Sequence, residues 1–366
     1  MYPYNPQHVE LKTVFICGIL SGRYNFTRIH VDQGSKITST HNLYNNILKT
    51  WYAEQVLEKI TVRAFSTSAN LGPGYDILAL AHNAFSDELV MEKSHDDPYG
   101  SIRIFADGVP REVEKNSAGL SLLKLFHEYG IRESVTIRIK KRVPIGAGLG
   151  GSGCSSASSV TAANALFDLG ISKDDQIRFA MEGEAASSGT PHPDNVAASI
   201  YGNLVSVNSL NPPSARNISI GMELKLLSIV PDIHINGKTG VARSMVPKTI
   251  TMESHVQNSR NLSSLISGLM SGSRELIREG MNDHIVETAR NSMFPYYAKL
   301  KEKALSNNAI GVCVSGAGPT ILVLYDEETN IRAIEDGTKH IMNAAGLRYQ
   351  TVHSVPSEGI NIERSE

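Results

Sequence analysis

The chain has 366 residues, of which 41% are hydrophobic and 20% charged, and its formal net charge is −2 at pH 7. This length is sufficient for two domains, and the small net charge excludes a general attraction to nucleic acid or to an anionic membrane surface. No run of about 18 apolar residues occurs, which argues against a membrane-spanning helix. The three cysteines, Cys17, Cys154 and Cys313, are far apart, so we expect neither disulfides nor structural zinc and predict a cytoplasmic protein with reduced thiols.

Residues 1–56 differ in composition from the rest of the chain. They are rich in Asn, Tyr, Thr and Ser and contain few acidic residues. Their apolar patch at 14–20 is too short to cross a bilayer and lacks the layout of a signal peptide. A lineage-specific extension, a targeting peptide and translation from a start site called too early are all open interpretations. We expect a dispensable, poorly ordered extension.

Regular patterning begins at about residue 60. The apolar spacing predicts strands at 60–65, 77–93 and 135–140 and helices at 116–129, 155–169 and 176–187. A polar stretch at 208–215 contains two adjacent prolines and is the best candidate for a domain boundary. We therefore predict one domain at 57–212 and a second at 213–366.

The second half alternates between the two kinds of pattern. The predicted elements are strands at 223–230, 309–314, 320–325 and 348–353 and helices at 254–271, 273–290, 294–306 and 329–345. This order of elements predicts an α+β domain with an antiparallel sheet.

A glycine-rich loop at 144–155 separates the predicted strand 135–140 from the helix that follows it. Four of its five glycines, Gly146, Gly148, Gly150 and Gly151, are crowded close together. Glycines allow an anion to approach the backbone closely, and the start of a helix adds partial positive charge. The loop therefore predicts a phosphate site, although a glycine-rich turn without a ligand is the alternative.

Two familiar phosphate-binding patterns are excluded by their context. Gly146-x-Gly148-x-x-Gly151 matches the dinucleotide fingerprint, but the acidic residue at the required spacing, Asp168, falls in a predicted helix instead of ending a second strand. The Gly-Lys-Thr at 237–239 lacks the earlier glycine of a Walker loop. A nicotinamide dehydrogenase and a P-loop protein are therefore improbable, and protein-kinase motifs do not occur.

The loop resembles the central motif of the GHMP family of small-molecule kinases, Pro-x-Gly-x-Gly-Leu-Gly-Ser-Ser-Ala. The matching residues are Pro144, Gly146, Gly148, Leu149, Gly150 and Ser152. Gly151 and Gly153 replace a Ser and an Ala of the motif. Two further motifs at 66–76 and 315–320 resemble the family's first and third motifs in the same order. The resemblance covers everything from about residue 60 onward.

The resemblance implies a two-domain α+β fold, with a ribosomal-protein-S5-like nucleotide domain followed by a ferredoxin-like domain. Within the family, the first motif and the segment 190–198 are similar to those of homoserine kinases. Asn195 stands where mevalonate kinases carry a catalytic Asp. The implied reaction transfers the γ-phosphoryl group of ATP to L-homoserine, a step of threonine biosynthesis, with Mg²⁺ and in a homodimer. A mevalonate or shikimate kinase is the alternative, and a non-catalytic binding protein is a more distant one.

The resemblance also implies roles for the nucleotide and metal residues. The nucleotide-binding residues are Asn116, Pro144, Gly146, Gly148, Leu149, Gly150, Gly151, Ser152 and Gly153. Asn116 is expected to contact adenine, although an ordinary helix N-cap is an open alternative. Ser152 and Glu184 are expected to hold Mg²⁺, with the Thr239 hydroxyl nearby. A solvated helix face beside Glu182 is the alternative for Glu184.

The implied substrate is a zwitterion, which requires groups of both charges. Arg243 and Arg290 resemble the family's carboxylate-binding arginines, whose planar geometry suits bidentate contacts. Asn70 and Asp76 resemble the ammonium-binding pair. His192 and Asn195 are expected on the alcohol side. There Asn195 orients the hydroxyl, and no protein base is assigned. Asn195 thereby joins Ser152, Glu184 and Thr239 in the implied catalytic group.

Overall fold

The computed structural model describes residues 12–20, 23–31, 57–95, 99–188, 192–233 and 237–364. The chain divides into two compact units, residues 1–56 and 57–366. In the first unit, β1 (Lys12–Leu20) and β2 (Arg23–Val31) form an antiparallel hairpin. The remainder of the expected extension lies outside the described residues. The second unit carries every predicted site residue.

The larger sheet of the second unit carries the first motif at the junction of β3 and β4, and the second motif follows its strand β6. Its path is β13-β3-β4-β6-β5, and β7 pairs with β4 and β8 with β7. The strands are β3 (Lys59–Asn70), β4 (Gly74–Ser94), β5 (Ile102–Ala106), β6 (Ser134–Lys140), β7 (Leu204–Leu210), β8 (Pro213–Ile218) and β13 (Asn361–Arg364). All pairs are antiparallel except β5 with β6.

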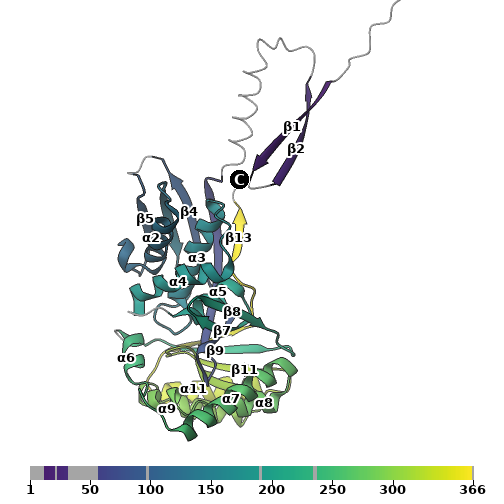
Figure 1. Ribbon diagram of the computed structural model, residues 1–366. Coiled ribbons are helices and arrows are strands. Elements are labelled where there is room, and N and C mark those ends of the chain that lie inside the picture. Colours follow the sequence, from purple (N-terminus) through teal and green to yellow (C-terminus); the bar gives the residue numbers. More distant parts are fainter. Residues whose placement is uncertain are drawn as a thin grey trace, which may run out of the picture. The chain divides into compact units, whose positions relative to one another are not determined.

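Helices form a layer against this sheet. They are η1 (Val113–Lys115), α2 (Ser117–Tyr129), α3 (Gly151–Leu166), α4 (Lys173–Ser188) and α5 (Pro193–Tyr201). Helices α3 and α5 contact β3 and β4 directly, and α2 and α4 pack beside α3 (Figure 1). Helix α3 is buried along almost its whole length, because its small Ala and Ser side chains let neighbouring elements approach closely. The start of α3 is therefore held rigidly at the edge of the glycine loop.

The smaller sheet has the order β10-β11-β9-β12 and is antiparallel throughout. Its strands are β9 (Lys225–Pro231), β10 (Gly311–Val314), β11 (Ile321–Tyr325) and β12 (Tyr349–Ser354). Its helices are α6 (Lys238–Ser244), α7 (Met252–Ser271), α8 (Arg274–Gly280), α9 (Val286–Arg290), η2 (Asn291–Met293), α10 (Tyr297–Leu305) and α11 (Ile331–Ala344). The antiparallel sheet and the α+β class agree with the predictions.

Alternation along the strands gives the smaller sheet two apolar faces. Leu226 and Leu324 face a core shared with α7, α8 and residues of the larger sheet such as Leu78 and Leu204. Leu227 faces a second core shared with α10 and α11. The first of these cores joins the two sheets, so the two halves of the unit share buried apolar surface.

Several sequence predictions need correction. Helix α3 begins at Gly151, not at 155, so the glycine loop runs directly into the helix. The predicted helix 273–290 is two helices, because the Asp283 carboxylate accepts the backbone N–H groups of Ile285, Val286 and Glu287 and starts a new helix there.

The proposed boundary at 212/213 is also misplaced. It falls inside the β7–β8 hairpin, whose strands both belong to the larger sheet. The turn prolines mark the hairpin turn instead of a linker. The final strand, β13, was not predicted at all, and it returns to pair with β3.

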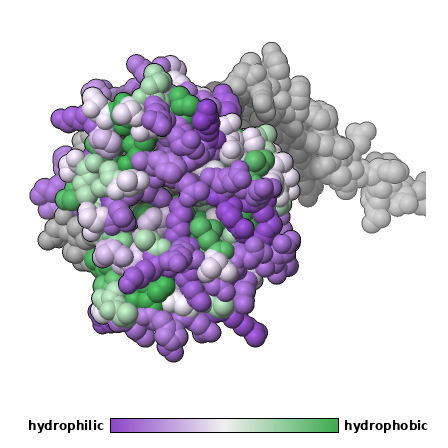
Figure 2. Space-filling view, turned by 90° about the horizontal axis from the view of Figure 1, so that it is seen from below, coloured by the Kyte–Doolittle hydropathy of each residue, from purple (hydrophilic) through white to green (hydrophobic). Residues whose placement is uncertain are grey.

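Within the described ranges, no helix combines the length and apolar character needed to cross a bilayer. On the face shown in Figure 2, hydrophobic residues occur as separate patches among hydrophilic ones.

Candidate active site

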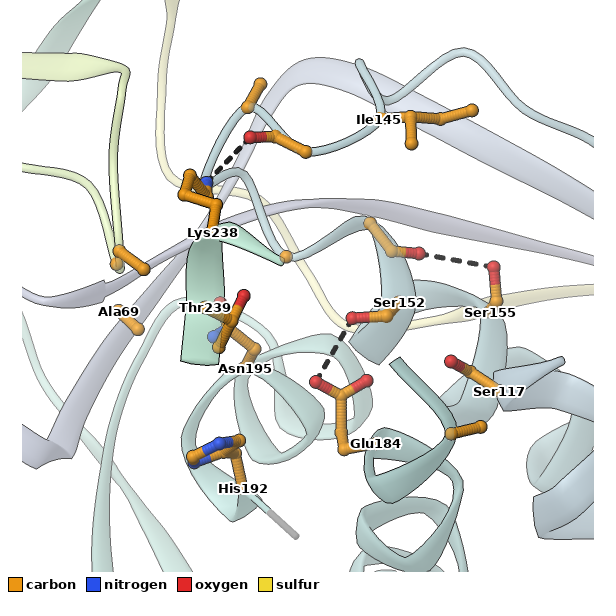
Figure 3. Close-up of a pocket in the computed structure, with 18 of the residues that line it drawn as sticks. Ala69, Ser117, Ile145, Ser152, Ser155, Glu184, His192, Asn195, Lys238 and Thr239 are labelled. Atoms are coloured by element: carbon orange, nitrogen blue, oxygen red, sulfur yellow. Dashed lines mark hydrogen bonds between the residues drawn. The ribbon is translucent and has the colours of Figure 1, made fainter. Parts of the chain in front are cut away.

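A cavity of about 410 Å³ gathers most of the predicted site residues. Its lining includes Asn70, Asp76, Asn116, Pro144, Gly146, Gly148, Gly150, Gly151, Ser152, Glu184, His192, Asn195, Thr239, Arg243 and Arg290. Gly316 and Ala317 of the third motif also line the cavity, so all three motifs and both halves of the unit contribute to it. Figure 3 shows Ser152, Glu184, His192, Asn195 and Thr239 around one space.

Two predicted nucleotide residues do not line this cavity. Leu149 is buried in a small core with Val143, Ala147 and Cys154. Gly153 lies against α5, where an added Cβ would come within 3.1 Å of the Asn195 Cβ. Both positions shape the loop from behind instead of facing the cavity.

Each backbone carbonyl of residues 146–151 accepts a hydrogen bond from another group of the protein. The donors are Lys238 Nζ to Gly146, Thr320 N to Ala147, Ser315 Oγ to Gly148, Thr67 N to Leu149, Cys154 N to Gly150 and Lys141 Nζ to Gly151. No side chain caps the N-terminus of α3. The first turn of that helix therefore leaves N–H groups available for an anion.

Gly148 and Gly150 fit where no other residue would. Gly148 has φ +82°, and a Cβ there would lie 2.5 Å from the carbonyl oxygens of Ser315 and Gly318. Gly150 has φ +68°, and its Cβ would overlap the Thr67 hydroxyl. At Gly151 the nearest atom would be 3.5 Å away, so the family's usual Ser could fit. The third motif thus supports the second by close backbone contact.

Ser152 and Glu184 meet at the start of α3. The Ser152 hydroxyl donates to Glu184 Oε2 over 3.1 Å (Figure 3). Glu184 is buried, whereas Glu182 is exposed, so the solvated-face alternative applies to Glu182 only. Burial raises the pKa of Glu184 to about 7. A hydroxyl and a carboxylate are hard oxygen donors of the kind that Mg²⁺ prefers, so this pair fits the ion.

Asp76, expected to bind the ammonium of the substrate, forms an ion pair with Arg243, expected to bind its carboxylate. Arg243 Nη2 lies 3.1 Å and 3.3 Å from the two Asp76 carboxylate oxygens and 2.6 Å from His192 Nδ1. Burial and Arg243 lower the pKa of His192. Arg290 is buried and donates from Nε to the carbonyl of Ala242.

Asn195 lies at the start of α5, between the glycine loop and the substrate groups. Its Oδ1 accepts from the Thr67 hydroxyl over 2.7 Å. Its backbone N–H donates to Asp194 Oδ1. Asp194 lines the cavity, and burial with nearby Asp76 raises its pKa to about 7.

Asn116 has the geometry of a helix N-cap, the alternative to a contact with adenine. Its Oδ1 accepts from the N–H groups of Ala118 and Gly119, and its Nδ2 donates to the carbonyl of Pro110. It is the N-cap of α2, although it also lines the cavity. Contact with adenine stays a prediction.

The cavity residues that the sequence prediction missed include Asp194, Lys141, Lys238 and Tyr75. Lys141 contacts Asp87, the Gly151 carbonyl and Ser155. Lys238 is buried and donates to the carbonyls of Gly146 and Gly318. The Tyr75 ring lies near both arginines. Their positions in the sequence could have identified them, because each lies within or next to a motif or beside a residue already assigned to the site.

Anion-binding N–H groups, a hard-oxygen pair and a charged substrate end together define a small-molecule phosphotransferase. The pattern for the GHMP kinase N-terminal domain matches residues 116–203, and that for the C-terminal domain matches residues 265–340. The chain belongs to the GHMP kinase family and is an ATP-dependent small-molecule kinase.

Individual relatives support this assignment over almost their whole length. A homoserine kinase of Sulfurisphaera tokodaii is 45% identical over 305 residues, covering 83% of this chain and 99% of the relative. A homoserine kinase of Saccharolobus solfataricus is 47% identical over 303 residues, covering 82% and 97%. The crystal structure of homoserine kinase from Cytophaga hutchinsonii shares 32% identity with a TM-score of 0.76, covering 84% and 98%.

Proposed function

We propose that this enzyme transfers the γ-phosphoryl group of ATP to the hydroxyl of L-homoserine, giving ADP and O-phospho-L-homoserine. The choice of substrate rests on one observation, that Asp76 lies opposite Arg243 and Arg290 beside the glycine loop. These groups suit the ammonium and carboxylate of an amino acid. The relatives described above bear the name of this activity.

The nucleotide end is built for triphosphate. The N–H groups at the start of α3 and the helix dipole stabilise phosphate charge. Ser152 and Glu184 would hold Mg²⁺, which neutralises charge on the phosphates when bound. Glu184 must be ionised for this role, and its raised pKa places that ionisation near neutrality.

The substrate end holds the amino acid by both charges. Arg243 and Arg290 bind the carboxylate, and Asp76 with Asn70 accepts hydrogen bonds from the ammonium. The Asp76 backbone N–H donates to Asn70 Oδ1, which ties the two residues together. Holding both ends orients the terminal hydroxyl toward the phosphoryl group.

The hydroxyl is positioned and not deprotonated in advance. Asn195 orients it while the new O–P bond forms and the bond to ADP breaks. The hydroxyl proton passes to the transferred phosphoryl group. A loose transition state needs little assistance from a base, so His192 and Asp194 hold the substrate end without an obligatory proton transfer.

A coupled assay of ADP release with Mg·ATP tests the proposal, comparing L-homoserine, mevalonate and shikimate. We expect turnover with homoserine only, lost in Glu184→Ala and kept in Glu182→Ala, the exposed neighbour on α4. Turnover only with another alcohol would keep the kinase and reject the substrate. ATP binding without any turnover would favour the binding-protein alternative.

Two finer expectations belong to the same proposal. A homodimer is expected from the family resemblance, and sedimentation velocity of the purified chain measures it. A cytoplasmic location is expected from the cysteine usage, and cell fractionation measures it.

A further inference from the structure

A buried chain of polar side chains connects the three motifs behind the cavity. His82 on β4 lies 3.1 Å from the Ser68 hydroxyl through Nε2. The Ser68 and Ser315 hydroxyls are 2.8 Å apart, and Ser315 Oγ donates to the Gly148 carbonyl over 2.7 Å. His82, Ser68 and Ser315 are each 0% exposed. No water can replace these bonds without opening the core.

The Ser315 hydroxyl can donate to Ser68 Oγ or to the Gly148 carbonyl, and we assign its single hydrogen to the carbonyl, which only accepts and is the nearer of the two. With that assignment, Ser68 donates to Ser315 and His82 Nε2 donates to Ser68. The other ring nitrogen, Nδ1, accepts from the Ser354 hydroxyl at 3.3 Å and lies 3.4 Å from the Ser66 hydroxyl oxygen. The arrangement requires neutral His82 with its hydrogen on Nε2, and burial, which lowers its pKa to about 4, favours the neutral ring.

We propose that His82 is a positioning residue for nucleotide binding, acting through Ser68 and Ser315 to fix the Gly148 peptide of the glycine loop. Since a trans peptide is planar, holding the Gly148 carbonyl also fixes the direction of the following N–H. The inference rests on the proposed function, because it assumes that this loop binds ATP.

Ser66 provides a matched control for the serine variants. It is on the same strand, β3, and is equally buried. Its hydroxyl donates to the His82 backbone carbonyl over 2.8 Å and accepts from the Phe85 N–H. Its oxygen also lies 3.4 Å from His82 Nδ1, the ring nitrogen that does not contact Ser68. Because its hydrogen is used by the carbonyl, Ser66 is not a link between His82 and Gly148. Ser66→Ala should lower stability without changing affinity for nucleotide.

The test measures ADP binding by calorimetry and steady-state KM values on the full chain. Ser68→Ala and Ser315→Ala should each weaken ADP binding and raise KM for ATP about fivefold to tenfold, with KM for homoserine unchanged. The double variant should resemble Ser315→Ala alone, because either change breaks the same chain. His82→Leu should behave like Ser68→Ala, and His82→Gln, which keeps a donor, should restore binding.

Each outcome has a definite meaning. Equal losses in Ser66→Ala, additive effects in the double variant, or a nitrogen-15 NMR spectrum with the His82 hydrogen on Nδ1 would overturn the inference. Wild-type chain that binds no ADP would overturn the proposed function and this inference together. Wild-type binding with unaffected serine variants would overturn the inference alone.

Discussion

Two buried carboxyl groups, Glu184 and Asp194, dominate the electrostatics of the cavity. Burial raises the pKa of each to about 7. A raised pKa means that folding favours the protonated form, so the ligand-free site is strained when both groups are charged. Binding of a cation beside Glu184 relieves that strain, which couples metal binding to the release of a proton.

The raised pKa of Glu184 also predicts how the stability of the ligand-free protein depends on pH. The folded pKa of Glu184 lies above its unfolded value, so its contribution is fully present below about pH 4.5 and lost as the pH rises through about 7. The free energy of unfolding of the ligand-free wild type should therefore fall relative to Glu184→Gln between about pH 5 and about pH 8, by on the order of 3 kcal/mol. Urea unfolding of both proteins at both pH values measures this change. Glu182→Gln is the control. A difference in unfolding free energy between wild type and Glu184→Gln that stays constant with pH would contradict the prediction.

The ion pair between Asp76 and Arg243 gives a second prediction at this scale. Asp76→Asn removes the ammonium partner, so KM for homoserine should rise about tenfold or more while KM for ATP stays within about twofold. Steady-state kinetics with each substrate varied measures both. Asp107→Asn is a suitable control, because Asp107 is fully exposed and pairs only with Arg111 nearby. A similar rise in both KM values would argue against a substrate contact.

At the scale of elements, the glycine loop works because other elements occupy its carbonyl side. The third-motif loop, β3, α6 and the end of β6 each supply donors to it. The loop is therefore not an autonomous motif. Its conformation depends on close packing that only glycine allows at Gly148 and Gly150.

Two glycine substitutions separate this packing from backbone strain. Gly148→Ala places a Cβ against two carbonyl oxygens and should abolish detectable ADP binding. Gly170→Ala has a similar positive φ of +66° but no neighbour within 4 Å and lies outside the cavity lining, so it should cost about 1–2 kcal/mol of stability and keep binding. Calorimetry and thermal unfolding distinguish them. Equal effects would show that strain alone is responsible.

Local patterns predicted the elements and motif residues whose signals lie within a short stretch. The strand 135–140, the helix 116–129 and the cavity residues of all three motifs are examples. Contacts between distant segments could not be predicted. The buried Lys238 is recognisable only when Gly146 and Gly318 are placed beside it, and β13 has no partner in the sequence near it. The break at Asp283 was missed because apolar spacing continues across it.

At the scale of the whole molecule, every cavity residue that the structure describes lies in the unit 57–366. The relatives match over 303–307 residues, close to the length of this unit. The two sheets share one buried core, and the chain returns from β12 of the smaller sheet to β13 of the larger one, so the unit is expected to unfold in one step.

A variant that starts at Leu57 after an initiator Met tests this division. It should keep kcat and both KM values within about twofold of the full chain, because no cavity residue is removed. Kinetics and circular dichroism of the purified variant measure activity and folding. Loss of activity in a folded variant would assign the first 56 residues a part in the reaction.

The pairing of β13 with β3 also has a consequence for biosynthesis. Ile60, near the start of the larger sheet, pairs with Arg364, and Arg63 forms an ion pair with Glu363. During translation, β3 leaves the ribosome long before β13. The edge of β3 that β13 covers therefore stays unpaired in the meantime, and an unpaired edge can recruit strands of other chains. Nascent chains should depend on chaperones until β13 has emerged.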